Sequence, residues 1–154
     1  MRYLKPNAPD HEGNSIACDP HYQEGYGSWK GPYSSFRRCS YQKDTFEHAM
    51  DYTREFWRAY NNDRKVFFVN FLDMHEGTHE VISYLDKPLA NFIQEFKADN
   101  TTILVFADHG PHTGGILQYL GGPQFETERL NPMFIASNLK GLPSDKKHNL
   151  ERNQ

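Results

Sequence analysis

Two short segments of this chain concentrate residue types that could bind a metal ion. The first is Asp73-Met74-His75-Glu76-Gly77-Thr78-His79, and the second is Asp108-His109-Gly110-Pro111-His112. Together they hold four of the eight histidines of the chain. Carboxylate and imidazole groups suit a borderline divalent ion such as zinc or manganese. The candidate metal ligands are therefore Asp73, His75, His79, Asp108 and His109.

The first segment also matches the HExxH pattern of zinc proteases, through His75, Glu76 and His79. In that pattern a helix places both histidines on one face, and the glutamate is the general base. Here the pattern follows directly on a strand-like run, and a helix-disfavouring glycine stands at its third position. A zinc metalloprotease is therefore kept only as an alternative. A second alternative is that both segments are solvated turns of a plain α/β domain.

The elements around these segments would bring them together. Residues 65–72 and 101–107 are almost continuous runs of β-branched and aromatic residues, which is typical of parallel strands buried on both faces. Residues 81–97, between them, repeat apolar side chains with a helical period. This order predicts a strand–helix–strand unit. Its two parallel strands would end at the same edge of the sheet, where ligands bind in such folds.

The rest of the chain is organised around this unit. We expect an amphipathic helix over 44–61 and a third strand over 133–137. Residues 1–42 show no apolar period and are expected to form an irregular covering segment, whereas 144–154 form a polar tail. The predicted fold class is α/β, with mainly parallel strands flanked by helices in a domain over 43–143.

Composition excludes some classes of protein and suggests a compartment. The 154 residues carry a net charge of −3, which gives no basic footprint for nucleic acid. No apolar run reaches the ~18–20 residues of a membrane span. A bridge between Cys18 and Cys39 would favour a secreted or lumenal protein, although two free thiols in a cytosolic protein are the alternative. The N-terminal residues lack the apolar stretch of a signal peptide.

The residues around the second segment resemble a known superfamily. The run Thr102–Gly110 is similar to the last metal-binding strand and loop of the alkaline phosphatase superfamily, which includes sulfatases, nucleotide pyrophosphatases and phosphoglycerate mutases. Further stretches resemble one eukaryotic, sulfatase-like branch known mainly as a domain of unknown function. These stretches are Asn70–His75, Leu85-Asp86, Gly121–Pro123 and Asn131–Ile135. The resemblance spans about residues 39–140 and corresponds to the C-terminal half of such an enzyme.

The resemblance implies part of a doubly wound α/β sheet that holds two divalent ions, often zinc, or one calcium ion in true sulfatases. Asp108 and His109 match the pair that binds the metal next to the nucleophile. Asp73 and His75 match the loop of the other metal, with His79 as a competitor for the role of His75. His112 is the candidate for a later histidine of the family and for substrate binding.

The implied activity is hydrolysis of phosphate or sulfate esters of small molecules or glycans. The nucleophile of the superfamily (Thr, Ser or a modified Cys) lies in an upstream strand–loop–helix, and residues 1–64 show no such pattern. We therefore expect the C-terminal portion of a metal-dependent hydrolase that is incomplete without a nucleophile half, with its catalytic residue unknown. The alternative is a non-catalytic remnant or binding module on the same scaffold.

Overall fold

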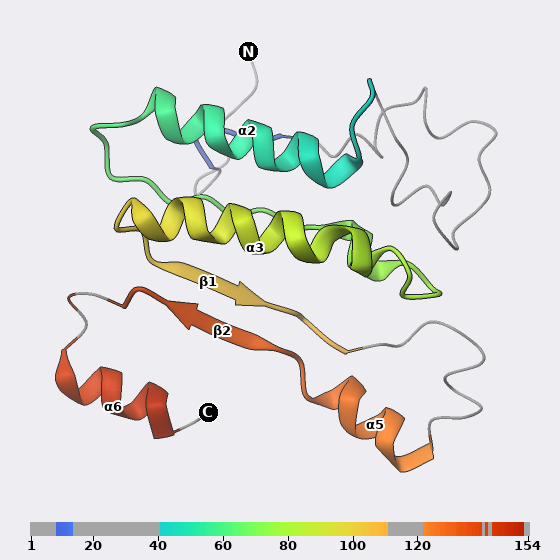
Figure 1. Cartoon of the computed structure of the whole chain (residues 1–154). Coiled ribbons are helices and arrows are strands. Elements are labelled where there is room, and N and C mark those ends of the chain that lie inside the picture. Colours follow the sequence, from blue (N-terminus) through green and yellow to red (C-terminus); the bar gives the residue numbers. More distant parts are fainter. Residues whose placement is uncertain (1–8, 14–40, 111–121, 140, 142, 153–154) are drawn as a thin grey trace.

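The computed structural model describes residues 9–13, 41–110, 122–139, 141 and 143–152 (Figure 1). The elements are α2 (Thr45–Ala59), the 3₁₀ turn η2 (Leu72–His75), α3 (Ile82–Ala98), β1 (Ile103–Phe106), α5 (Gly122–Leu130), β2 (Phe134–Ser137) and α6 (Ser144–Arg152). The expectations for Cys18, Cys39 and His112, and for most of the segment 1–42, lie outside the described residues. Within the described ranges, no helix is long and apolar enough to cross a membrane.

Helix α2 confirms the helix predicted over 44–61. Asp44 is its N-cap residue, and the backbone N–H of Asp44 donates to the Glu47 carboxylate at 2.7 Å. This bond closes the first turn, where backbone donors otherwise lack partners. The buried side of the helix consists of Phe46, Met50 and Thr53.

Helix α3 confirms the helix predicted over 81–97, and Pro88 lies inside it. The two helices lie side by side (Figure 1). Met50 of α2 and Leu85 of α3 belong to one buried cluster, and partly buried residues such as Phe71 pack against it. The cluster is built from Phe46, Met50, Leu85 and Phe92.

Strands β1 and β2 lie within the predicted ranges 101–107 and 133–137. They pair antiparallel, with Ile103 opposite Ser137 and Phe106 opposite Phe134. The sheet of the described residues consists of this pair. A larger, mainly parallel doubly wound sheet therefore stays a prediction. Helix α5, which was not expected, precedes the returning strand.

Residues 64–71 differ from the strand expected over 65–72. The segment is extended, but it belongs to no strand of the described structure, and its side chains alternate between half-buried and exposed. The Phe67 ring lies 5.1 Å from that of Phe56 on α2, whereas the Phe68 ring lies 6.0 Å from that of Phe106. Among the described elements, helices therefore cover only one side of the segment, and this explains the alternation.

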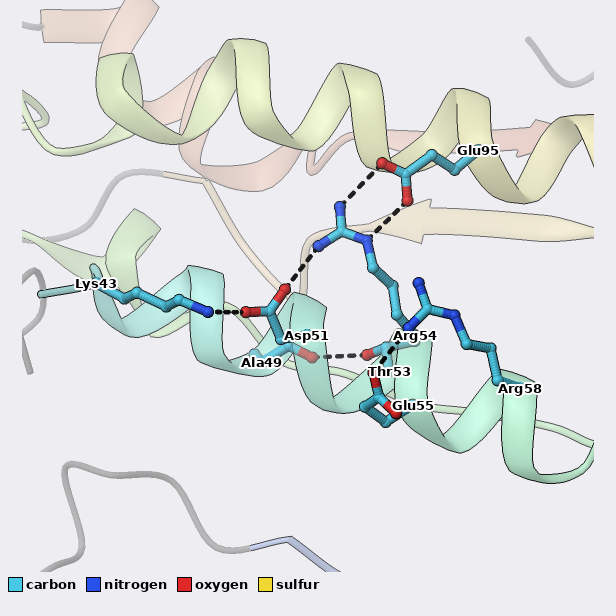
Figure 2. A network of polar contacts seen from close by, with 8 residues as sticks. All are labelled: Lys43, Ala49, Asp51, Thr53, Arg54, Glu55, Arg58 and Glu95. Atoms are coloured by element: carbon cyan, nitrogen blue, oxygen red, sulfur yellow. Dashed lines mark hydrogen bonds and ion pairs between the residues drawn. The ribbon is translucent and has the colours of Figure 1, made fainter. Parts of the chain in front are cut away.

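A charged network links α2 to α3 (Figure 2). Arg54 donates from Nε and Nη2 to the Glu95 carboxylate, at 2.7 and 3.0 Å, and from Nη1 to Asp51 at 2.9 Å. Lys43 also donates to Asp51. Mainly because of the hydrogen bond from Arg54, the pKa of Glu95 lies below its usual value. The hydrogen bond from Lys43 is the largest cause that lowers the pKa of Asp51.

These lowered pKa values predict a loss of stability in acid. A carboxylate with a depressed folded-state pKa stabilises the fold above its unfolded pKa of about 4, and the contribution disappears as the pH falls through the folded value. Both carboxylates are well exposed to solvent, so we expect the Arg54–Glu95 pair to contribute only about 0.5–1 kcal/mol at neutral pH. Urea unfolding of the wild type and of Glu95→Gln at pH 7 and pH 3 checks this. The difference between the two proteins should shrink at pH 3, and an unchanged difference would contradict the assignment.

Candidate functional site

The first polar loop begins at η2 and is organised around two buried carboxylates. Asp73 is 1% exposed and Glu76 is 0% exposed. The Glu76 carboxylate accepts hydrogen bonds from the backbone N–H and the hydroxyl of Thr78, both at 2.7 Å. The N–H of His79 donates to the Glu76 carbonyl at 3.1 Å, and His79 has a left-handed backbone with φ of 61°. The loop is therefore folded inward at Asp73 and Glu76.

The second polar loop follows β1 directly and is held by its own backbone. The N–H of Ala107 donates to the Met133 carbonyl, and the N–H of Gly110 donates to the Arg129 carbonyl, each at 3.0 Å. Asp108 has an 87% exposed side chain, which accepts a bond from the N–H of His109 at 3.1 Å. The loop is thus fixed against the chain that leads into β2, while the Asp108 carboxylate is turned to solvent.

The tautomer of His109 follows from its partner. Its Nδ1 atom lies 2.7 Å from the Gly110 carbonyl oxygen. A carbonyl oxygen can only accept, so Nδ1 must carry the proton in the neutral ring. The lone pair is then on Nε2, which lies 3.7 Å from the Asp108 carboxylate. An imidazole held in this way through one nitrogen is typical of a metal-binding histidine.

The two loops meet through their histidines. The His75 and His109 ring centroids lie 6.1 Å apart, with the rings nearly perpendicular. Phe68 lies near Phe106 in the preceding segments, so residues 64–75 and 103–109 run in the same direction. The two loops therefore lie close together, although residues 64–71 form no strand of the described sheet.

The other predicted ligands do not complete a metal centre. Asp73 is buried, whereas Asp108 is turned to solvent. In the part of the chain that the structure describes, no three His, Cys, Asp or Glu side chains form a group that could hold a metal ion. Of the predicted metal ligands, the described structure therefore brings His75 and His109 together.

The geometry of residues 75–79 does not match the protease pattern. His75 ends the 3₁₀ turn, the following residues form turns, and α3 begins only at Ile82. The two histidines of the pattern therefore do not share a helical face, and the Glu76 carboxylate is buried against Thr78. These observations disfavour the metalloprotease alternative.

Sequence reasoning did not identify the Glu76–Thr78 contact or the charged groove beside α2. The Glu-x-Thr spacing was the available signal for the contact, because a threonine two residues on can bond a preceding acidic side chain. The groove, of about 440 Å³, lies between α2 and α3 and is lined by residues that include Lys43, Asp51, Arg54, Lys87 and Glu95. None of the residues that line it belongs to either histidine loop.

The described elements are helices and a two-stranded antiparallel sheet, with a histidine pair beyond the carboxyl end of β1. Over residues 22–146, the chain matches the model of a family described as Protein of unknown function (DUF229). The match covers most of the chain, so the chain belongs to this family. No curated protein and no solved structure matches the chain.

Proposed function

We propose that the chain is the C-terminal portion of a metal-dependent hydrolase of phosphate or sulfate esters, of the alkaline phosphatase-like and sulfatase-like type. The observation that carries the proposal is the meeting of His75 and His109 at the ends of two segments that run in the same direction. In α/β folds, ligands bind beyond the carboxyl ends of the strands. Membership of a family of unknown function is compatible with the proposal and does not specify a substrate.

The donor types fit a zinc ion better than a harder cation, because both meeting side chains are imidazoles. His75 and His109 would hold the ion, with Asp108 beside His109 and with Asp73 and His79 as further candidates. A second ion, or calcium in place of zinc, would suit a more carboxylate-rich donor set. When bound, the ion supplies Lewis acidity toward an ester oxygen and lowers the pKa of a hydroxyl or water.

Residues around His109 set its orientation for the proposed metal binding. The Gly110 carbonyl fixes the tautomer of His109 so that Nε2 carries the lone pair of the neutral ring, and the exposed Asp108 carboxylate is next to it. His112 is the proposed substrate-binding residue. The chain supplies no residue that matches the nucleophile pattern of the alkaline phosphatase superfamily. In this proposal the covalent step therefore belongs to a nucleophile half outside this sequence. We therefore expect the isolated chain to bind zinc weakly and to hydrolyse esters poorly or not at all.

Zinc titration of point variants tests the ligand assignment. By isothermal titration calorimetry, His75→Ala and His109→Ala should each weaken zinc binding by about tenfold or more, because each removes one imidazole donor. His148→Ala is the matched control, since His148 is exposed on α6 and outside both loops, and it should bind as the wild type does. Equal affinities for all three variants would refute the assignment.

Assays with chromogenic phosphate and sulfate esters test the need for an external nucleophile. We expect no saturable turnover by the chain alone. Robust saturable hydrolysis that is lost in Asp108→Ala would overturn the half-enzyme proposal, because the chain would then be a complete catalyst.

A non-catalytic scaffold is the second candidate. It is favoured by the finding that no three ligand side chains converge among the described residues. If the wild-type chain binds no zinc in the same titration, the non-catalytic scaffold replaces the metal-dependent hydrolase as the proposed function.

A further inference from the structure

Five side chains form an exposed apolar surface, which we call the apolar face. Phe106 and Phe134 are directly opposite in the β1–β2 register, so they share one side of the sheet. Leu104 is two residues before Phe106 and shares that side, and the Phe68 ring lies 6.0 Å from Phe106. The members and their exposures are Val66 94%, Phe68 74%, Leu104 52%, Phe106 53% and Phe134 53%.

The opposite side of residues 64–71 and of β1 is covered by helices, whereas Ile135 of β2 is 50% exposed on that side. Phe67 packs against Tyr52 and Phe56 of α2, and α3 contacts β1. The alternating residues Ile103 and Val105 are half-buried, whereas Leu104 and Phe106 are exposed. Figure 1 shows α2 and α3 stacked in order beside the sheet. Helices α2 and α3 thus cover one side of residues 64–71 and β1, and the apolar face is the other surface of these segments.

The size and composition of the apolar face match half of a protein–protein interface. From the exposed fractions, its five side chains present roughly 600 Å² per copy, so a symmetric pair would bury about 1,200 Å². This is the lower end of the range for stable interfaces. All five members are apolar, so no like charges oppose one another when two copies of the face meet. An exposed apolar patch of this size lies at the upper end of what a monomer typically exposes, and such patches are often functional.

We propose that a second copy of this chain covers the apolar face in a two-fold, face-to-face pair. A two-fold axis places the same patch of both copies in contact, so an uncharged face is automatically complementary to itself. Phe68, Phe106 and Phe134 supply the aromatic contacts that are enriched in such interface centres. None of the five side chains is a candidate ligand, so this proposal is tested separately from the zinc assignment.

The oligomeric state of the full chain tests the proposal. Light scattering coupled to gel filtration, from low to hundreds of micromolar, should show a species of about twice the 18.0 kDa of one chain. Val66→Glu and Phe68→Glu should each weaken the pair by about tenfold or more, because a charge would be desolvated against apolar surface. Val66 is almost fully exposed, so its substitution should leave the circular dichroism spectrum unchanged.

Leu130→Glu is the control, because Leu130 is an exposed apolar residue of α5 outside the face, and it should leave the pair intact. A wild-type chain that stays monomeric throughout this range overturns the proposal, and the cover then comes from elsewhere in the chain or from another protein. A pair that persists in both Val66→Glu and Phe68→Glu also overturns it, since the contact must then lie on another surface.

Discussion

Leu85→Ala is expected to lower the free energy of unfolding by about 3–4 kcal/mol. Leu85 is fully buried on α3 and belongs to the cluster that joins the two long helices. Truncation removes its contacts and leaves a cavity that the surrounding aromatic side chains cannot easily fill. Among the described residues, the buried hydrophobic core has five members, so this loss is a large part of the stability available.

The matched control is Leu130→Ala, which makes the same substitution at an exposed position of α5. It should change the free energy of unfolding by no more than about 0.5 kcal/mol. Urea unfolding followed by circular dichroism measures both variants. Similar losses in the two variants would show that the α2–α3 cluster is not the stabilising core.

Glu76→Gln is expected to cost about 2 kcal/mol of unfolding free energy. The buried Glu76 carboxylate accepts from two donors of Thr78, and an amide offers only one oxygen in place of two. The substitution keeps the size of the side chain and changes only its charge and its hydrogen-bonding groups. Glu80→Gln, at an exposed position of the same loop, should be neutral to within about 0.5 kcal/mol.

The same variant also separates a structural role for Glu76 from a protease role. A general-base glutamate would be essential for peptide cleavage and of little importance for folding. Wild-type stability in Glu76→Gln, together with the loss of a measurable peptidase activity, would contradict the structural role of Glu76.

The long elements were predictable because their pattern is local. The helical period over 44–61 and 81–97 predicted α2 and α3. The short runs of β-branched and aromatic residues predicted β1 and β2. The alternation in residues 64–71 was not predictable, because it depends on which faces the rest of the molecule covers. Helix α5 was missed because the sequence of residues 122–130 has no apolar repeat with a helical period.

The candidate site was predictable to the level of loops and not of side chains. The residues after Leu72 and after Ala107 come close together, as the contact between the His75 and His109 rings shows, whereas the shared edge of a parallel sheet stays a prediction. The burial of Asp73 and the exposure of Asp108 could not be derived from the sequence. Residue order places a carboxylate in a turn, but the direction of its side chain is set by the tertiary packing around the turn.

The two backbone bonds that hold the second loop have a mechanical consequence. Gly110 is tied to Arg129, the penultimate residue of α5, and Ala107 is tied to Met133 just before β2. His75 is the last residue of η2 and belongs to the other loop, which continues from η2 to α3. A displacement of α5 would therefore move His109 relative to His75. The separation of the two imidazoles thus depends on the position of a helix that contributes no residue to either loop.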